Sequence, residues 1–514
     1  MRSLFAFLSA FLLAGSALAQ GKTENVQLES KHLKYELAVT IWTPPGYDTD
    51  DKTRKYPVIY CCQNTGMPTR QIAELIAAGH YPAFIMVNFI GLPVGGETSN
   101  AAVWSDMRQP SGSFFRLELI PWIDAKYRTI ANERGRVLIG CSKAGGGVTH
   151  LGLKYPDLFC AFVSLDGALA LYDKGGRDLD YVAKGDGYFQ LIEKNEQKLK
   201  AMPMLFIEGG WFWKVGREYL DEFRKRGLND LEVIDDRDLD HNVGTMFTRH
   251  LPEIMTVFVN GTSGGPSVKP RIEPAGGVFA RSTQVRLTPP ADGIALYATT
   301  DGSDPALKGT LVKEPITLDK SALVRVVGKS KDGSIATRQS IARFEIPTPL
   351  SPAPAKNLEA GWSATYVRGS LGKDSTELLR QIHLGKGESL ATVKLATIEL
   401  PEPPEAVKKE KEVTVVIHGL LDVPETDSYR FLIEGNSAGL YLLNSSATKI
   451  DKVLQLRGLK TAEVSLVLER GPHLIAFVTS VSAGKGAIDV KVRDRKGAFV
   501  SVPREWLKQA EQLK

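Results

Sequence analysis

The chain of 514 residues is long enough for about three domains of ordinary size. Its 64 Lys and Arg residues against 59 Asp and Glu give a formal net charge of +5, which is nearly neutral for this length. This balance gives no electrostatic reason to expect nucleic acid or anionic membranes as partners. Hydrophobic residues make up 43% of the chain, which excludes a disordered protein and suffices for several buried cores.

The first twenty residues have the pattern of a cleavable export signal. Arg2 supplies a positive charge, Leu4–Ala14 is mostly apolar, and Ala17-Leu18-Ala19 has the small residues of a cleavage site. The apolar run is too short to span a bilayer, and no later run reaches the roughly 18 apolar residues that spanning requires. We therefore expect removal of residues 1–19 and an exported protein, periplasmic or extracellular, without a membrane span.

Residues 24–260 alternate short apolar runs with helix-like segments, which predicts one α/β domain with a mostly parallel sheet and helices on both faces. Four cysteines in a chain of this length do not make a disulfide scaffold, and we expect buried free thiols. Helix-like spacing covers 115–127, 216–226 and 247–258. The predicted strands are Val58–Cys62, Phe84–Phe89, Val137–Gly140, Ala161–Leu165 and Met204–Ile207.

The pattern changes after residue 260. Gly and Ser residues at 261–266 and Pro and Ser residues at 347–354 predict two linkers. Between and beyond them, residues 268–347 and 357–502 alternate polar and apolar positions, with turn signals such as Asp301-Gly302. This pattern predicts two all-β sandwich domains.

The most informative motif is Gly140-Cys141-Ser142-Lys143-Ala144-Gly145, which lies between a predicted strand and a predicted helix. A nucleophile elbow needs this arrangement, because the Ser sits on a tight, strained turn between small neighbours. The usual pattern is G-x-S-x-G, and Ala144 stands here at the last Gly. Ser142 is therefore the candidate nucleophile, and the backbone N–H of Lys143 is a candidate oxyanion donor.

These residues and several further motifs resemble one branch of the α/β-hydrolases. Residues 36–259 are similar to the esterase D and feruloyl esterase branch, which also includes acetyl xylan esterases, enterochelin esterases and mycolyltransferases. The resemblance implies a serine esterase that needs no cofactor or metal. Its further motifs are Thr43-Pro44-Pro45-Gly46-Tyr47, the run from Glu118 to Thr129, and Tyr155-Pro156-Asp157-Leu158-Phe159.

The base of such a site follows the nucleophile and the acid in chain order. His241 lies in a loop before the helix predicted at 247–258, where the resemblance implies the catalytic His. His150 is two helical turns after Ser142 and points elsewhere, and His250 is interpreted as a solvated or packed helix residue. We predict that His241 is the general base.

The acid is where the sequence departs from the family. The resemblance implies an Asp in the turn after Met204–Ile207, but that turn reads Glu208-Gly209-Gly210-Trp211-Phe212-Trp213. One alternative is Asp166, which ends the strand after the nucleophile, as in pancreatic lipases. A second alternative is Glu208, and a third is that the site has no acid. Asp166 could also have a purely structural role, because an Asp followed by Gly is common in turns.

The second oxyanion donor also departs from the family. Where the resemblance implies His-Gly-Gly after the strand Val58–Cys62, the chain has Gln63 and Asn64, whose backbone or amide N–H groups are candidate donors. Trp211 and Trp213 are candidates for an aromatic acyl or sugar pocket, with core packing as the alternative.

The two β-rich segments carry resemblances of their own. Residues 268–347 resemble the chitobiase C-terminal-type sandwich, through Tyr297 and the string Thr300-Asp301-Gly302-Ser303-Asp304-Pro305. Residues 357–502 resemble the protective-antigen-type sandwich, through segments such as Arg470-Gly471-Pro472-His473, but lack its acidic calcium-binding pair. These resemblances imply accessory modules, and sugar binding by the second is no better supported than a spacer role.

Taken together, the sequence predicts an exported serine carboxylesterase that removes acetyl or feruloyl groups from polysaccharide or a related natural ester. A siderophore esterase of the enterochelin type is an alternative within the same chemistry. A catalytically impaired hydrolase scaffold that binds carbohydrate is the alternative from another class, favoured by the altered acid and oxyanion positions. The sequence does not fix the oligomeric state.

Overall fold

The computed structural model describes most of the chain after the predicted signal segment. The described residues are 21–32, 35–62, 68–89, 113–169, 187–209, 212–228, 230–236, 241, 243–265, 267–369, 389–400, 402–435, 439–443, 450–455, 461–482, 488–494 and 497–513. They form two compact units, the first made of residues up to 275 with 285–316 and 322–343, the second of 276–284, 317–321 and 344–514. The predicted export signal lies outside the described residues.

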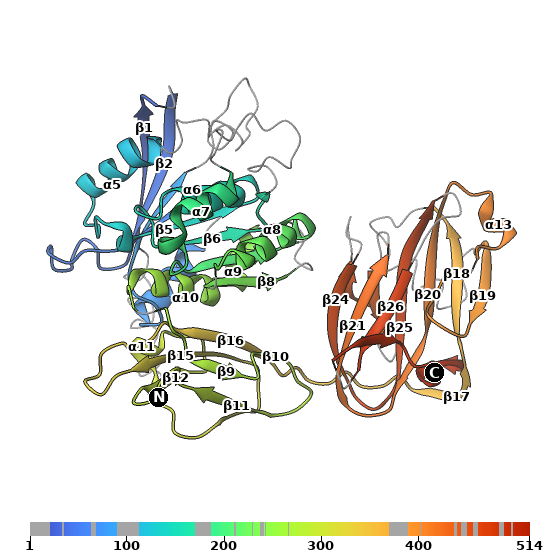
Figure 1. Cartoon of the computed structure of the whole chain (residues 1–514). Coiled ribbons are helices and arrows are strands. Elements are labelled where there is room, and N and C mark those ends of the chain that lie inside the picture. The colour runs from blue at the N-terminus through green and yellow to red at the C-terminus, as the bar shows by residue number, and fades with distance from the viewer. Residues whose placement is uncertain are drawn as a thin grey trace, which may run out of the picture. The chain divides into compact units, whose positions relative to one another are not determined.

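An eight-stranded sheet forms the centre of the first unit (Figure 1). Its order is β1-β2-β4-β3-β5-β6-β7-β8, and the strands from β4 to β8 in this order are parallel. β1 and β2 pair antiparallel at one edge. The strands are β1 (Lys22–Ser30), β2 (Tyr35–Thr43), β3 (Val58–Cys62), β4 (Ile85–Phe89), β5 (Arg136–Cys141), β6 (Ala161–Leu165), β7 (Met204–Glu208) and β8 (Leu231–Asp235).

The predicted α/β architecture is confirmed, and both faces of the sheet are covered. Within β3 the alternation of side chains sends Val58 and Tyr60 into one core and Ile59 into the other. Strands buried on both faces require continuous apolar runs, which is why these strands were visible in the sequence. The helices are α2 (Thr69–Ala77), the π-helix η1 (Phe115–Leu119), α5 (Ile120–Lys126), α6 (Lys143–Lys154), α7 (Tyr188–Leu199), α8 (Trp213–Lys225), α9 (Val243–Arg249) and α10 (Leu251–Thr262).

Two predicted helices have a more complex form. The segment 115–127 starts as a π-helix and continues as α5, with Pro121 in the first turn, where its missing N–H is tolerated. The helix predicted at 247–258 is wrong as a single element, because α9 ends and α10 begins at His250, whose φ is −105° and ψ is 17°. Pro252 explains the break, since a proline favours the first turn of a new helix. α10 also extends into the predicted linker, up to Thr262.

Residues 271–345 form two sheets of short strands. One is a three-stranded sheet in the order β14-β11-β9, and the other has the order β10-β16-β15-β12-β13. β9 pairs antiparallel with β11, and β12 pairs antiparallel with β13 and β15, whereas β10 pairs parallel with β16. The strands are β9 (Arg271–Glu273), β10 (Gly277–Val278), β11 (Thr283–Thr288), β12 (Ala295–Thr299), β13 (Thr310–Leu311), β14 (Ile316–Leu318), β15 (Ala322–Lys329) and β16 (Ser340–Glu345), with helix α11 (Pro305–Lys308).

The second unit contains a larger pair of antiparallel sheets. One runs β17-β28-β20-β25-β22-β23, with β18 and β19 beside it, and the other runs β24-β21-β26-β27. The last strand, β28, lies beyond residue 502, where the sequence predicted the domain to end. The elements are β17 (Ala355–Ala360), β18 (Trp362–Arg368), β19 (Ala391–Leu395), α13 (Glu405–Lys408), β20 (Glu412–Val423), β21 (Asp427–Gly435), β22 (Gly439–Leu443), β23 (Ile450–Gln455), β24 (Thr461–Leu468), β25 (Gly471–Ser482), β26 (Ile488–Arg493), β27 (Phe499–Ser501) and β28 (Leu507–Leu513).

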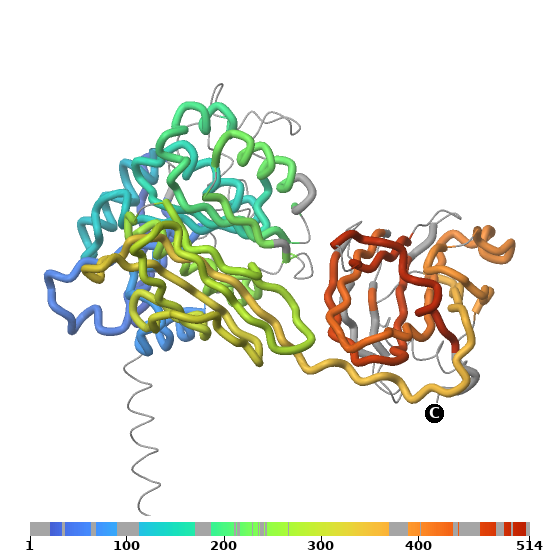
Figure 2. Tube along the Cα trace, turned by 60° about the horizontal axis from the view of Figure 1, so that its bottom comes forward, coloured from blue at the N-terminus to red at the C-terminus, as the bar shows by residue number. Residues whose placement is uncertain are grey.

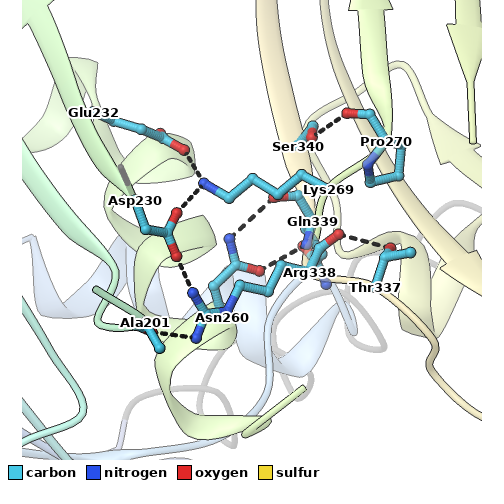
Figure 3. Close-up of polar contacts among 10 residues, drawn as sticks. All are labelled: Ala201, Asp230, Glu232, Asn260, Lys269, Pro270, Thr337, Arg338, Gln339 and Ser340. Carbon is cyan, nitrogen blue, oxygen red and sulfur yellow. Dashed lines mark hydrogen bonds and ion pairs between the residues drawn. The ribbon is translucent and has the colours of Figure 1, made fainter. Parts of the chain in front are cut away.

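Within the first unit, the strands of residues 285–316 and 322–343, here called the β-rich strands, lie against the α/β part (Figure 2). Polar groups join the two parts (Figure 3). Asn260 at the end of α10 exchanges two hydrogen bonds with the backbone of Gln339, at 3.0 and 2.7 Å. Arg338 pairs with the buried Asp230, which also lies 2.7 Å from the Lys269 ammonium group. Such paired groups hold one arrangement, because separating them would leave buried charges and amides without partners.

No helix in the described ranges is long and apolar enough to cross a membrane.

Candidate active site

Ser142 occupies the turn between β5 and α6 in a conformation that non-glycine residues rarely adopt. Its φ is 56° and its ψ is −126°. The turn is held by its own backbone, since the Ser142 N–H donates to Leu165 O at 3.0 Å and Ser142 O accepts from Ala168 N–H at 2.8 Å. A strained, partly exposed Ser between a buried strand and a helix N-terminus has the geometry of a nucleophile elbow.

The small neighbours of Ser142 are required by close backbone contacts. A Cβ atom at Gly140 would lie 2.3 Å from Ala144 O, and one at Gly145 would lie 2.8 Å from Gly167 Cα. Ala144 itself is fully buried and fits without such a clash in the helix. The elbow therefore accommodates Ala at the last position of G-x-S-x-G, whereas Gly145 must stay small because of the backbone of Gly167.

Asp166 lies beside this turn, directly after β6. Leu165 pairs with Cys141 across the two parallel strands, so that the residues following them meet at the carboxyl edge of the sheet. Asp166 has a positive φ of 41° and is fully buried. Its Oδ1 atom accepts the backbone N–H groups of Gly209 and Phe212, both at 3.1 Å. The carboxylate is thus anchored by the turn that follows β7.

His241 meets the other oxygen of the same carboxylate. Its Nδ1 atom lies 2.7 Å from Asp166 Oδ2, and its ring packs edge-on against Phe212, with centroids 5.6 Å apart. When the imidazole is neutral, this bond places the proton on Nδ1 and leaves Nε2 as the basic nitrogen. The carboxylate is fully buried and the imidazole side chain is 15% exposed, so part of the ring remains accessible.

The other candidate acid lies elsewhere. Glu208 ends β7 and is buried, and its carboxylate lies against α8, where a Cβ atom at Gly216 would be 2.3 Å from Oε2. The structure therefore brings Asp166, and not Glu208, to His241. His150 packs against Tyr188 inside the domain, with ring centroids 6.2 Å apart.

The remaining predicted site residues are only partly described. Lys143 is the first residue of α6, where backbone N–H groups have no partner within the helix. Gln63, Asn64 and Trp211 lie outside the described residues, and Trp213 is described only as the first residue of α8.

The thiol next to the nucleophile is not suited to replace it. Burial holds the pKa of the Cys141 thiol well above its ordinary range, and the negative charges of Asp166 and Cys61 add to this effect. Because the thiolate is the reactive form of cysteine, a thiol with such a raised pKa is inert at neutral pH. The four cysteines are free, as the sequence predicted, and Cys160 alone is only partly buried.

The two backbone donors to Asp166 were missed in the sequence. In the sequence, the turn after β7 lacks the carboxylate that the family has there. In the structure, the Gly209 and Phe212 N–H groups of this turn donate to the carboxylate of Asp166, which follows the neighbouring strand β6. Gly209 was the available signal. A Cβ atom there would lie 2.8 Å from Asp166 Cγ, so that only glycine leaves room for the acid.

Comparison with known families concerns the first part of the chain. Residues 30–222 match the family described as "Putative esterase". This part of the chain is an esterase-family domain. The esterase resemblance predicted from the motifs is thereby confirmed, and the match includes Ser142, Asp166 and Glu208 but ends before His241. Nothing in the comparisons bears on the two β-sandwich resemblances, which stay predictions, as do the predicted domain boundaries.

Several solved structures resemble the esterase domain at low identity. A ferulic acid esterase is 22% identical and covers 47% of this chain and 98% of its own, with a TM-score of 0.40. An S-formylglutathione hydrolase from Agrobacterium tumefaciens is 18% identical over 46% of this chain and 96% of its own, with a TM-score of 0.37. An enterochelin esterase from Shigella flexneri is 14% identical over 46% of this chain and 58% of its own, also with a TM-score of 0.37. No curated protein matches the chain by sequence.

Proposed function

We propose that the protein is an exported serine carboxylesterase that uses Ser142, His241 and Asp166. The observation that carries the proposal is the 2.7 Å contact between His241 Nδ1 and Asp166 Oδ2 at the sheet edge where Ser142 stands on a strained turn. A nucleophile, a buried carboxylate and an imidazole, in this order along the chain, match the order and the roles of an α/β-hydrolase triad.

The reaction follows from these atoms. Ser142 Oγ attacks the ester carbonyl carbon while His241 Nε2 takes the hydroxyl proton. The bond to the leaving alkoxide then breaks, and the imidazolium returns the proton to it, which leaves an acyl-enzyme. Water repeats the sequence and releases the acid and Ser142. The Lys143 N–H is the proposed donor to the oxyanion, and Asp166 holds the imidazole and stabilises its charged form.

The substrate proposal is an acylated polysaccharide or a related natural ester, with acetyl or feruloyl as the acyl group. It is supported by the feruloyl-esterase-type motifs and by the sequence resemblances of the two β-rich segments to modules of carbohydrate-active enzymes. Because one fold can carry many different functions, these resemblances support the substrate class by analogy. Export is supported by the signal pattern of residues 1–19, and we expect N-terminal sequencing of the mature protein to begin near Gln20.

The deciding experiment is hydrolysis of p-nitrophenyl acetate and methyl ferulate by the mature protein beside its Ser142→Ala variant. We expect turnover that depends on Ser142, and the ratio of the two rates gives the acyl preference. Equal rates for protein and variant on both esters would refute the esterase. They would favour a carbohydrate-binding protein on a hydrolase scaffold, to be tested by polysaccharide pull-down.

A further inference from the structure

A second His–Asp pair lies at the two ends of the segment that carries His241. Asp236 directly follows β8, and His250 lies between α9 and α10. His250 Nε2 is hydrogen-bonded to Asp236 Oδ2, and Arg249 Nη1 lies 3.1 Å from Asp236 Oδ1. The start of the His241 segment is therefore tied directly to its end.

Further polar contacts connect this pair to β16 in the same unit. Glu253 on α10 lies with Oε2 3.9 Å from His250 Nδ1. Its Oε1 accepts two hydrogen bonds from Arg343 on β16, at 2.8 and 3.2 Å, and Arg343 also donates to Arg249 O at 3.0 Å. We call Asp236, Arg249, His250, Glu253 and Arg343 the His250 cluster.

The imidazole and the two carboxylates of the His250 cluster are buried. Asp236, His250 and Glu253 are 4%, 4% and 6% exposed, whereas the side chains of the two arginines that pair with the carboxylates are 39% and 33% exposed. Buried charges that are mutually paired tolerate few alternative arrangements, because each alternative leaves a charge without its partner. Arg343 supplies three of the hydrogen bonds, although it lies 90 residues beyond Glu253 in the chain.

We propose that the His250 cluster is a positioning device for His241, completed by Arg343 from the β-rich strands. It fixes both ends of the segment 236–250, which carries the imidazole that lies within hydrogen-bond distance of Asp166. The β-rich strands would then contribute to the chemistry of the esterase domain, not only to its attachment. This proposal rests on the proposed role of His241 as general base.

The test compares two arginines of the same interface in the full-length protein. Arg343→Ala removes the guanidinium of the His250 cluster. Arg338→Ala is the matched control, because Arg338 also joins the β-rich strands to the α/β part, but through Asp230, which precedes β8 and so lies at the opposite end of that strand (Figure 3). Steady-state kinetics on p-nitrophenyl acetate and thermal melting are measured for both.

We expect Arg343→Ala to lower kcat about ten- to a hundredfold with little change in KM, since small displacements of a catalytic group have effects of this size. Arg343→Lys should recover part of the loss, because an ammonium group can still reach Glu253. Arg338→Ala should lower Tm while leaving kcat within about twofold, as expected for a residue that affects only stability. An unchanged kcat in Arg343→Ala, or an equal loss in Arg338→Ala, would overturn the proposal.

A second readout separates this proposal from the proposed function. The ring signals of the eight histidines are followed by NMR with labelled histidine, and His241→Gln assigns the relevant one. We expect Arg343→Ala to shift the His241 signal and Arg338→Ala to leave it in place. This holds even if Ser142-dependent hydrolysis is absent and the esterase proposal fails, and an unshifted signal would refute positioning by itself. If Arg343→Ala does not fold, Glu253→Gln takes its place, because it keeps the shape and weakens the same pairing.

Discussion

Replacement of Asp166 by Asn tests the triad most directly, because the structure dictates how the new amide must lie. Asp166 Oδ1 accepts two backbone N–H groups, from Gly209 and Phe212, each at 3.1 Å. Only the carbonyl oxygen of an Asn side chain can take that place. Its NH₂ group must then occupy the Oδ2 position, 2.7 Å from His241 Nδ1.

This forced orientation reverses the tautomer of the imidazole. An NH₂ group donates, so His241 Nδ1 must accept and the proton of the neutral ring moves to Nε2, where a base is needed. The same change in a serine protease triad costs about 10⁴ in kcat, which corresponds to about 5 kcal/mol of activation free energy. We expect a loss of this order for Asp166→Asn, with the fold retained because both backbone hydrogen bonds persist.

The assay is kcat/KM for p-nitrophenyl acetate, with Glu208→Gln as the matched control. Both variants replace a buried carboxylate at neighbouring strand ends by its amide, but Glu208 lies against Gly216 of α8. We expect the control to keep its activity within about threefold, in line with a residue outside the reacting groups. Activity of Asp166→Asn within tenfold of the unaltered protein would refute the reasoning, and a large loss in Glu208→Gln instead would assign the acid to Glu208.

Three further outcomes follow from contacts described above. Gly209→Ala should lower kcat by about a hundredfold, because its methyl group would lie 2.8 Å from Asp166 Cγ, and kinetics beside a thermal melt would distinguish this from unfolding. Arg325→Ala should lower the free energy of unfolding by about 3 kcal/mol, since the fully buried guanidinium donates to Gly302 O, and a loss below about 1 kcal/mol in urea denaturation would contradict this. Burial raises the pKa of the Cys141 thiol well above its ordinary value, so native protein should resist alkylation there until it is unfolded, and rapid labelling would show a more open site.

The fold and the nucleophile could be predicted because their signals are local. The strand Ala161–Leu165 is a continuous apolar run, and the elbow of Ser142 needs only a strand, small residues and a helix in succession. The choice between Asp166 and Glu208 could not be made locally. It depends on how far the ends of β6 and β7 reach at the edge of the sheet. It also depends on the position of His241, which lies 75 residues beyond Asp166 in the chain.

The docking of the β-rich strands was invisible in the sequence for a different reason. Its contacts are made by single polar residues, such as Asn260 and Gln339, that follow no period and look like ordinary surface positions. Turn and linker composition therefore predicted a flexible connection at 261–266, although α10 continues to Thr262. Polar groups that are buried only by a distant segment leave no mark in the local pattern.

The polar docking interface bears on any attempt to produce the catalytic part as a fragment. A chain cut after residue 265 would remove the partners of Asn260, Asp230 and Glu253 and leave these groups open to water. The loss of buried polar partners destabilises the domain, and partly unfolded chains self-associate. We expect such a fragment to aggregate during expression, and the smallest soluble catalytic fragment to extend through Arg343.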